Sequence, residues 1–177
     1  LFAQRDIVPL DHAARYVQAL PYGRTSEPDE PLSVLRESIG TCTLKHALLK
    51  LAAEEAGAID VELRLGVFEM SEATTPGIGK VLRRYGLECV PEAHCYLALE
   101  GDRLDFTGLP AGPESPFAHL LTEEPLPVSA LLREKAQRHR AIVEAWALER
   151  HLDPVVVWRA REACIQELAT LSSRGDR

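Results

Sequence analysis

Three residues of the types used in thiol catalysis occur along the chain in the order Cys42, His94 and Asp105. A cysteine attacks a carbonyl group as its thiolate, so it needs a base that takes the thiol proton, and the base needs an acceptor that orients its ring. Cys42 follows Gly40-Thr41 at the start of an Ala- and Leu-rich stretch. Free backbone N–H groups and the positive end of a helix dipole would stabilise a thiolate and an oxyanion there. The sequence therefore makes Cys42 a candidate nucleophile.

The register of a predicted β-hairpin over residues 88–106 decides whether His94 and Asp105 can meet. If Glu100-Gly101 forms a two-residue loop, Asp105 lies opposite Tyr96, on the strand face that also carries His94. The two residues are then diagonal neighbours, with Cα atoms roughly 7–8 Å apart, which their side chains can bridge. A turn displaced by one residue would move them too far apart. The hypothesis of an interacting pair therefore depends on the tighter register.

The elements that would hold these residues follow from hydrophobic periodicity and from glycine and proline positions. Residues 41–56 predict a helix that begins at Thr41 and ends before Gly57, and its nearly all-apolar surface indicates that it is buried against a sheet. The other predicted elements are helices over residues 11–20, 34–38 and 80–85, a strand over 61–70, the hairpin over 88–106, irregular loops over 21–33 and 109–127, and two C-terminal helices over 128–151 and from Asp153-Pro154 onward. The pattern predicts an α+β fold, in which a central N-terminal helix packs on an antiparallel sheet and a C-terminal helix pair packs on the core or on a partner.

The order and setting of these residues resemble the core of the transglutaminase-like superfamily. Gly40-Thr41-Cys42 opens an Ala/Leu-rich helix, the strand 61–66 follows, and His94 and Asp105 lie on the next hairpin. The resemblance covers about residues 38–108 and implies an α+β arrangement like that of papain-like cysteine proteases. It also implies that Cys42 is the nucleophile, His94 the general base and acid, and Asp105 the residue that orients His94. A catalytic triad with Asn as its third residue, in place of Asp105, is excluded because the chain contains no Asn.

The residues before the predicted Cys42 helix supply further candidates for the site. The loop over residues 21–24 precedes the helix and is expected to fold over it. Gln18 or Tyr22 could donate a second hydrogen bond to an oxyanion, and Arg24 could bind a substrate carboxylate. A purely structural turn, with Arg24 in a salt bridge, is the alternative interpretation.

His46 lies one helical turn after Cys42 and shares its face of the predicted helix. With His94 or Cys95 it could form a metal site, which is the main alternative to thiol catalysis for these side chains. Cys95 points to the opposite strand face from His94, however, and the chain has no C-x-x-C pair. We therefore expect no metal and no cofactor, and a His46 that is packed and hydrogen-bonded beside the site.

Composition excludes several classes of protein. Apolar residues make up 46% of the 177 and charged residues 27%, which is typical of a globular domain. The net charge of −7 argues against nucleic-acid binding, and no apolar run approaches the ~20 residues of a membrane span. The four cysteines lie at irregular spacings, so reduced thiols in the cytoplasm are expected. We predict one domain over residues 1–177, with an N-terminal helix and loop (1–37), a catalytic-like core (38–108) and a helical extension (109–177).

Two hypotheses for function follow from these observations. The first is a cysteine-dependent enzyme that acts on an amide- or thioester-like acyl group of a peptide, a protein or a small amide, by hydrolysis or by transfer to an amine. The second is a non-catalytic transglutaminase-like domain that binds a peptide or protein. The C-terminal helix pair could form the seam of a homodimer.

Overall fold

The computed structural model describes residues 10–175, apart from the side chains of residues 130–133 and 175. It divides into two compact units. The first unit runs to Leu65 and resumes over Cys95–Gly108 and Glu124–Leu131, and the second comprises Gly66–His94, Leu109–Glu123 and the chain from Leu132 onward.

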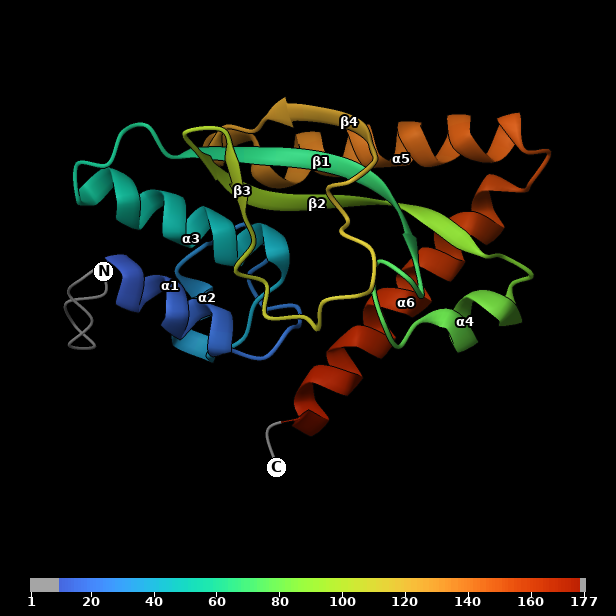
Figure 1. The fold of residues 1–177 in the computed structure, drawn as a ribbon, viewed down its shortest axis with the longest axis horizontal. Helices are drawn as coiled ribbons and strands as arrows, with labels where there is room; N and C mark the ends of the chain where they lie inside the picture. Colours follow the sequence, from blue (N-terminus) through green and yellow to red (C-terminus); the bar gives the residue numbers. More distant parts are fainter. Residues whose placement is uncertain (1–9, 176–177) are drawn as a thin grey trace. The chain divides into compact units, whose positions relative to one another are not determined.

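The predicted α+β class is confirmed. N-terminal helices lie on a four-stranded antiparallel sheet, and two C-terminal helices pack together (Figure 1). The elements are α1 (Leu10–Ala19), α2 (Ser33–Glu37), α3 (Cys42–Glu55), β1 (Glu62–Ser71), α4 (Gly79–Arg84), β2 (Cys89–Leu99), β3 (Asp102–Leu104), β4 (Leu120–Pro125), a 3-10 turn (Val128–Ala130), α5 (Leu131–Glu149) and α6 (Pro154–Gly175). Among these residues, no helix has both the length and the apolar character needed to cross a bilayer.

The helix α3 is the buried centre of the first unit. Ten of its fourteen residues are buried, which confirms the prediction drawn from its nearly all-apolar sequence. The helices α1 and α2 pack on it, and α1 presents Ala13 and Val17, spaced one turn apart, as its buried residues (Figure 1). The first turn of α3 is therefore held by packing on several sides.

The ends of α3 also lie where the sequence predicts them. Thr41 has the extended backbone of an N-cap, with φ −79° and ψ 168°, and its carbonyl oxygen accepts the N–H of Lys45. The side chain of Thr41 makes no capping hydrogen bond, so the cap is formed by the backbone alone. Beyond the last turn, Gly57 has φ +82°, the left-handed conformation that glycine adopts at little cost.

The β2–β3 hairpin has the tighter of the two registers considered. Leu97 pairs with Leu104 and Leu99 with Asp102. The turn residues Glu100 and Gly101 have φ values of +52° and +92°, as a two-residue hairpin turn of the primed type requires. The sheet order is β3-β2-β1-β4, so β3 is an edge strand. The strand ends at Leu104, so the prediction that Asp105 lies on this strand opposite Tyr96 is wrong: Asp105 is the first residue beyond the strand, where its side chain closes a turn with Thr107.

The prediction that residues 109–127 are irregular throughout is wrong for Leu120–Pro125, which form the edge strand β4. The strand carries Glu123 and Glu124 and ends at Pro125, and most of its residues are exposed. Charges and proline are common on edge strands, where one row of backbone groups needs no partner. The sequence therefore lacks the apolar alternation by which an inner strand is recognised.

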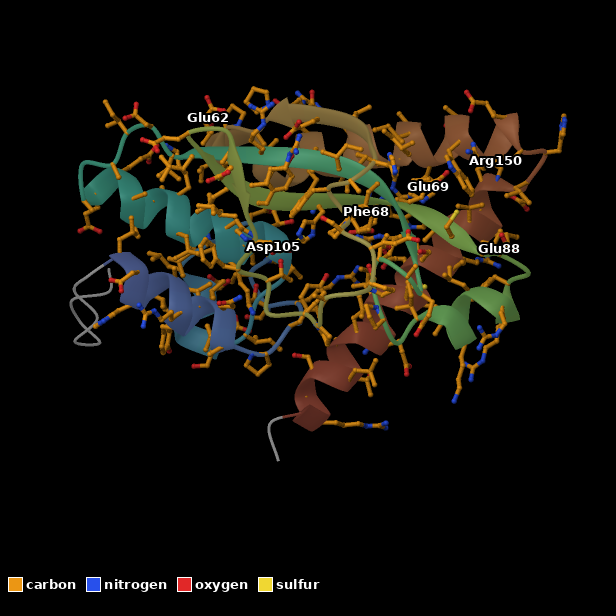
Figure 2. The ribbon with its side chains drawn as sticks, in the orientation of Figure 1. Glu62, Phe68, Glu69, Glu88, Asp105 and Arg150 are labelled. Atoms are coloured by element: carbon orange, nitrogen blue, oxygen red, sulfur yellow. The ribbon has the colours of Figure 1, made fainter. Side chains whose placement is uncertain are left out.

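In the second unit, hydrogen bonds define the start of α6 and attach α5 to the sheet. Asp153 caps α6, accepting the N–H of Val155 over 2.8 Å, with Pro154 at the first helical position as predicted. Trp146 on α5 donates through Nε1 to Glu69 Oε1 over 2.7 Å, and Arg150 reaches the same oxygen over 3.1 Å (Figure 2). These contacts attach the end of α5 to β1.

The second unit also buries a charged pair that the sequence analysis did not identify. Glu92 on β2 accepts two hydrogen bonds from Arg161 on α6, over 2.6 and 2.8 Å, and only 5% and 11% of these side chains are exposed. Burial alone would raise the pKa of Glu92, but the Arg161 guanidinium outweighs it and the pKa is lowered to about 2. His139 donates through Nε2 to the carbonyl oxygen of Pro91 over 2.9 Å beside this pair. The pair therefore joins α6 to the sheet.

Candidate functional site

Cys42 is the first residue of α3, and only 3% of its surface is exposed. The first N–H groups of an α-helix have no intrahelical acceptor, and the helix dipole is positive at this end. Sγ of Cys42 lies 3.9 Å from the hydroxyl of Thr43, the next residue. The thiol therefore has the helix-start position that the sequence predicts, in a buried setting.

The loop that precedes α2 is attached directly to the entry of α3. Tyr22 and Gly40 form a parallel bridge, in which Gly40 donates to the carbonyl of Pro21 over 3.2 Å and Gly23 donates to the carbonyl of Gly40 over 3.3 Å. Tyr22 is buried, with 4% of its surface exposed. The bridge thus holds this loop two residues before Cys42.

The other two candidates from this region are less enclosed. Gln18 lies on α1 and Arg24 in the loop, and both side chains are exposed. The backbone oxygen of Gln18 closely approaches Gly108, so the end of α1 touches the segment that follows the hairpin. An exposed Arg24 is accessible to a substrate carboxylate, which keeps its proposed role compatible with its position.

His46 is fully buried and uses both ring nitrogens. The backbone N–H of Phe106 donates to Nε2 over 2.7 Å, so Nδ1 carries the proton and donates to the carbonyl of Cys42 over 2.7 Å. Nε2 lies 3.5 Å from Asp105 Oδ1, but in this tautomer Nε2 has no proton and the contact is not an ion pair. His46 therefore joins the carbonyl of Cys42 to the segment after β3.

The hydrogen bonds of His46 bear directly on the metal hypothesis. A histidine ligates a metal through a ring nitrogen lone pair, and the Nε2 lone pair here accepts the Phe106 N–H. Within residues 10–175, no group of three or more His, Cys, Asp or Glu side chains is arranged to hold a metal ion. The described geometry thus favours a hydrogen-bonding role for His46.

Asp105 lies on the segment that leaves β3, beside α3 (Figure 2). Its Oδ1 accepts hydrogen bonds from both the backbone N–H and the hydroxyl of Thr107, the former over 2.9 Å. This is the local turn that an Asp side chain commonly closes. The Asp105 side chain is 30% exposed.

Lys45 is the residue of this region that the sequence analysis missed. It is fully buried, and its Nζ donates to the carbonyl oxygens of Leu20, over 2.5 Å, and Thr107, over 2.7 Å. Burial lowers the pKa of the Lys45 ammonium to about 8, against the opposing effect of the negative charges of Asp105 and Cys42. A lysine among the first residues of a helix that is predicted to be buried was the available signal, because buried charges need partners.

His94 belongs to the second unit, whereas Cys42 and Asp105 belong to the first. It lies on β2 with 9% of its surface exposed. Its ring meets Phe68 edge-on, with centroids 6.2 Å apart, and Phe117 at a tilt, with centroids 6.1 Å apart. The imidazole is thus oriented by aromatic packing within its own unit.

The other three cysteines differ from Cys42 in setting, and all four are free thiols. Burial raises the pKa of Cys89 to about 11 and that of Cys164 to about 12. Cys95 is fully buried in the middle of β2. Because a thiol reacts as its thiolate, the raised pKa values make Cys89 and Cys164 poor nucleophiles at neutral pH. Searches against family models, curated proteins and solved structures find no match to the chain.

Proposed function

We propose that this chain is a cysteine-dependent acyl-transfer enzyme of the transglutaminase-like type, in which Cys42 is the nucleophile, His94 the general base and acid, and Asp105 the residue that orients His94. The observation that carries the proposal is the position of Cys42 as the first residue of a buried fourteen-residue helix. That position offers a thiolate the positive end of the helix dipole and the backbone N–H groups of the first turn, and α1 and α2 pack on the same helix.

The proposed reaction has two steps. His94 takes the thiol proton, and the Cys42 sulfur attacks the carbonyl carbon of an amide or thioester, so that the carbonyl electrons move onto oxygen. The backbone N–H groups of the first turn of α3 are the proposed donors to that oxyanion. Collapse of the intermediate expels the leaving group, an amine from an amide or a thiol from a thioester, and the leaving group takes the proton from His94. An acyl thioester remains on Cys42. Water or a second amine then attacks the thioester carbonyl and gives a proton to His94. The acyl group leaves as a carboxylic acid or an amide, and the proton on His94 returns to the Cys42 sulfur.

The proposed substrates are the acyl groups of a peptide, a protein or a small amide. Whether the second step is hydrolysis or transfer depends on which nucleophile reaches the thioester. The loop at Tyr22 is the proposed element of control, because its bridge to Gly40 holds it beside the entry of α3. An exposed Arg24 on the same loop could select acyl groups that carry a carboxylate.

Acylation of the purified protein tests the proposal. Incubation with a panel of peptide thioesters and activated esters, followed by peptide mapping in a mass spectrometer, is expected to place one acyl group on Cys42. We expect Cys42→Ala to abolish labelling and His94→Ala to slow it at least about 100-fold, the usual contribution of a general base. Cys164→Ala is the matched control and is expected to label normally. Equal labelling of the wild type and Cys42→Ala would contradict the proposal.

A second candidate function is a non-catalytic domain of the same type that binds a peptide or protein. It is favoured by the engagement of Asp105 Oδ1, which accepts two hydrogen bonds from Thr107 as a purely structural aspartate would. Under this hypothesis Cys42 reacts with iodoacetamide no faster than an ordinary thiol, and His94→Ala leaves that rate unchanged. Two results are expected only if the chain is an enzyme. These are an acyl group on Cys42, and an alkylation of Cys42 that is faster than that of an ordinary thiol and depends on His94.

A further inference from the structure

Lys45 occupies a place in the first unit that is shaped for an ammonium group. Its stem and its head both lie against glycines: a Cβ on Gly40 would lie 3.0 Å from Cγ of Lys45, and a Cβ on Gly108 would lie 3.7 Å from Nζ. Two of the three Nζ–H bonds go to the carbonyls of Leu20 and Thr107. A fully buried lysine is rare unless its charge is compensated, so the groups around Nζ bear on the function of Lys45.

The connections of Lys45 lead to both Cys42 and Asp105. Lys45 follows Cys42 by three residues on α3, and side chains at this spacing share a helix face. Thr107, whose carbonyl accepts from Nζ, donates through its N–H and its hydroxyl to Asp105. A carboxylate at Asp105 and a thiolate at Cys42 would each stabilise the Lys45 ammonium, and both raise its pKa against the effect of burial.

We propose that Lys45 is a positioning residue of the Cys42 site, whose buried ammonium holds the Cys42 thiol in its ionised form and fixes the segment carrying Asp105 beside the first turn of α3. The inference rests on the proposed function, because it assigns the charge that prepares the proposed nucleophile. Lys45 touches no reacting atom in this scheme and transfers no proton.

His46 and the charged or titratable groups on α1 and α2 leave this role to Lys45. His46, on the same helix, is held in a neutral tautomer by Phe106. On the packed helices α1 and α2 the charged and histidine side chains are exposed, namely Asp11, His12, Arg15, Arg36 and Glu37, and Tyr16 is half-buried. Charges in water are screened more strongly than a buried one, so the Lys45 ammonium is expected to act on Cys42 more strongly than these exposed side chains do.

The ultraviolet absorbance of the Cys42 thiolate, taken as the difference between each protein and the same protein carrying Cys42→Ser, tests the inference directly. We expect Lys45→Met, which keeps the length of the stem, to raise the half-ionisation pH by about one unit or more, equal to tenfold less thiolate at fixed pH. Lys45→Arg restores a positive charge and is expected to recover part of the shift. The control is Lys50→Met on the same helix, whose side chain is 16% exposed and pairs with Glu54 over 3.1 Å, and which is expected to change nothing.

An unchanged titration in Lys45→Met, or an equal shift in Lys50→Met, would overturn the inference. If Lys45→Met does not fold, the reciprocal measurement decides, because coupling between two sites is equal in both directions. In protein with ¹⁵N-labelled lysine, Cys42→Ser is expected to lower the pKa of Lys45 seen by NMR, and an unchanged value rejects the coupling. Neither measurement uses an acyl substrate, so a shifted thiol pKa without acylation contradicts the proposed function while supporting the role of Lys45.

Discussion

The backbone N–H of Phe106 donates to Nε2 of His46 over 2.7 Å, and the opposite ring nitrogen donates to the carbonyl of Cys42. One fully buried imidazole therefore connects the first turn of α3 to the segment that leaves the hairpin. The bond also assigns the tautomer of His46, since a nitrogen that accepts an N–H carries no proton. His46 is thereby excluded, in this arrangement, as the base for Cys42.

Replacing His46 by alanine is expected to lower the free energy of unfolding by about 2–4 kcal/mol. The substitution leaves a cavity and removes the partners of a buried N–H and a buried carbonyl. Urea unfolding at neutral pH measures the change, with His12→Ala on α1, where the side chain is 60% exposed, as the matched control. A loss within about 0.5 kcal/mol, as is usual for a surface substitution, would contradict the bridging role of His46.

Gly108 is expected to tolerate alanine much less well than Gly57 does. Both glycines have positive φ values, +79° and +82°, so alanine introduces a similar backbone strain at each. A Cβ on Gly108 would lie 2.1 Å from the backbone oxygen of Gln18, whereas one on Gly57 would meet nothing within 4 Å. We expect Gly108→Ala to cost about 1–3 kcal/mol more than Gly57→Ala in denaturant unfolding. Equal losses would show that the close contact between α1 and Gly108 is absent in solution.

The buried pair of Glu92 and Arg161 is expected to show strong non-additivity. Arg161→Met leaves the Glu92 carboxylate buried without its main counter-charge, which costs about 3–5 kcal/mol. Glu92→Gln together with Arg161→Met removes both charges, and we expect the double variant to be more stable than Arg161→Met alone. Thermal unfolding of the four proteins completes a double-mutant cycle. Additive losses would mean that the two side chains do not interact in solution.

The same pair predicts a specific response to acid. The pKa of Glu92 is lowered from 4.5 to about 2, so its contribution to stability is complete above about pH 4.5 and is lost as the pH falls toward 2. The advantage of the wild type over Glu92→Gln is expected to shrink by on the order of 3 kcal/mol across this range. Glu134→Gln is the control, because the Glu134 side chain is 48% exposed and its carboxylate is not buried against a counter-charge as Glu92 is. An advantage that does not vary with pH would show that Glu92 titrates normally.

Much of the fold could be predicted from local sequence patterns. The apolar surface of α3, its start after Thr41 and its end before Gly57 all agree with the structure. The Glu100-Gly101 turn gave the correct hairpin register, because only that two-residue loop pairs Leu97 with Leu104. The edge strand β4 was missed because its exposed residues and terminal proline carry no alternating pattern.

The candidate site could be predicted only in part, because its contacts join distant residues. Cys42 at a helix start follows from Gly40-Thr41 and the Ala- and Leu-rich stretch after it. Asp105 was predicted on the second strand of the hairpin, opposite Tyr96, but β3 ends at Leu104 and Asp105 closes a turn with Thr107. The hydrogen bonds from Lys45 to Thr107 and from Phe106 to His46 did not follow from the sequence. The bond from Lys45 to Thr107 spans 62 positions and the one from Phe106 to His46 spans 60.

The linear chain, then, determined which residue types can carry chemistry and which helix and hairpin present them, because helix ends, tight turns and apolar periodicity arise from interactions between near neighbours. The tertiary structure alone decided that Lys45 is buried, that His46 is neutral and that Asp105 closes a turn with Thr107. These properties depend on loss of water and on hydrogen-bond partners supplied by remote segments, and both arise only when the chain is folded.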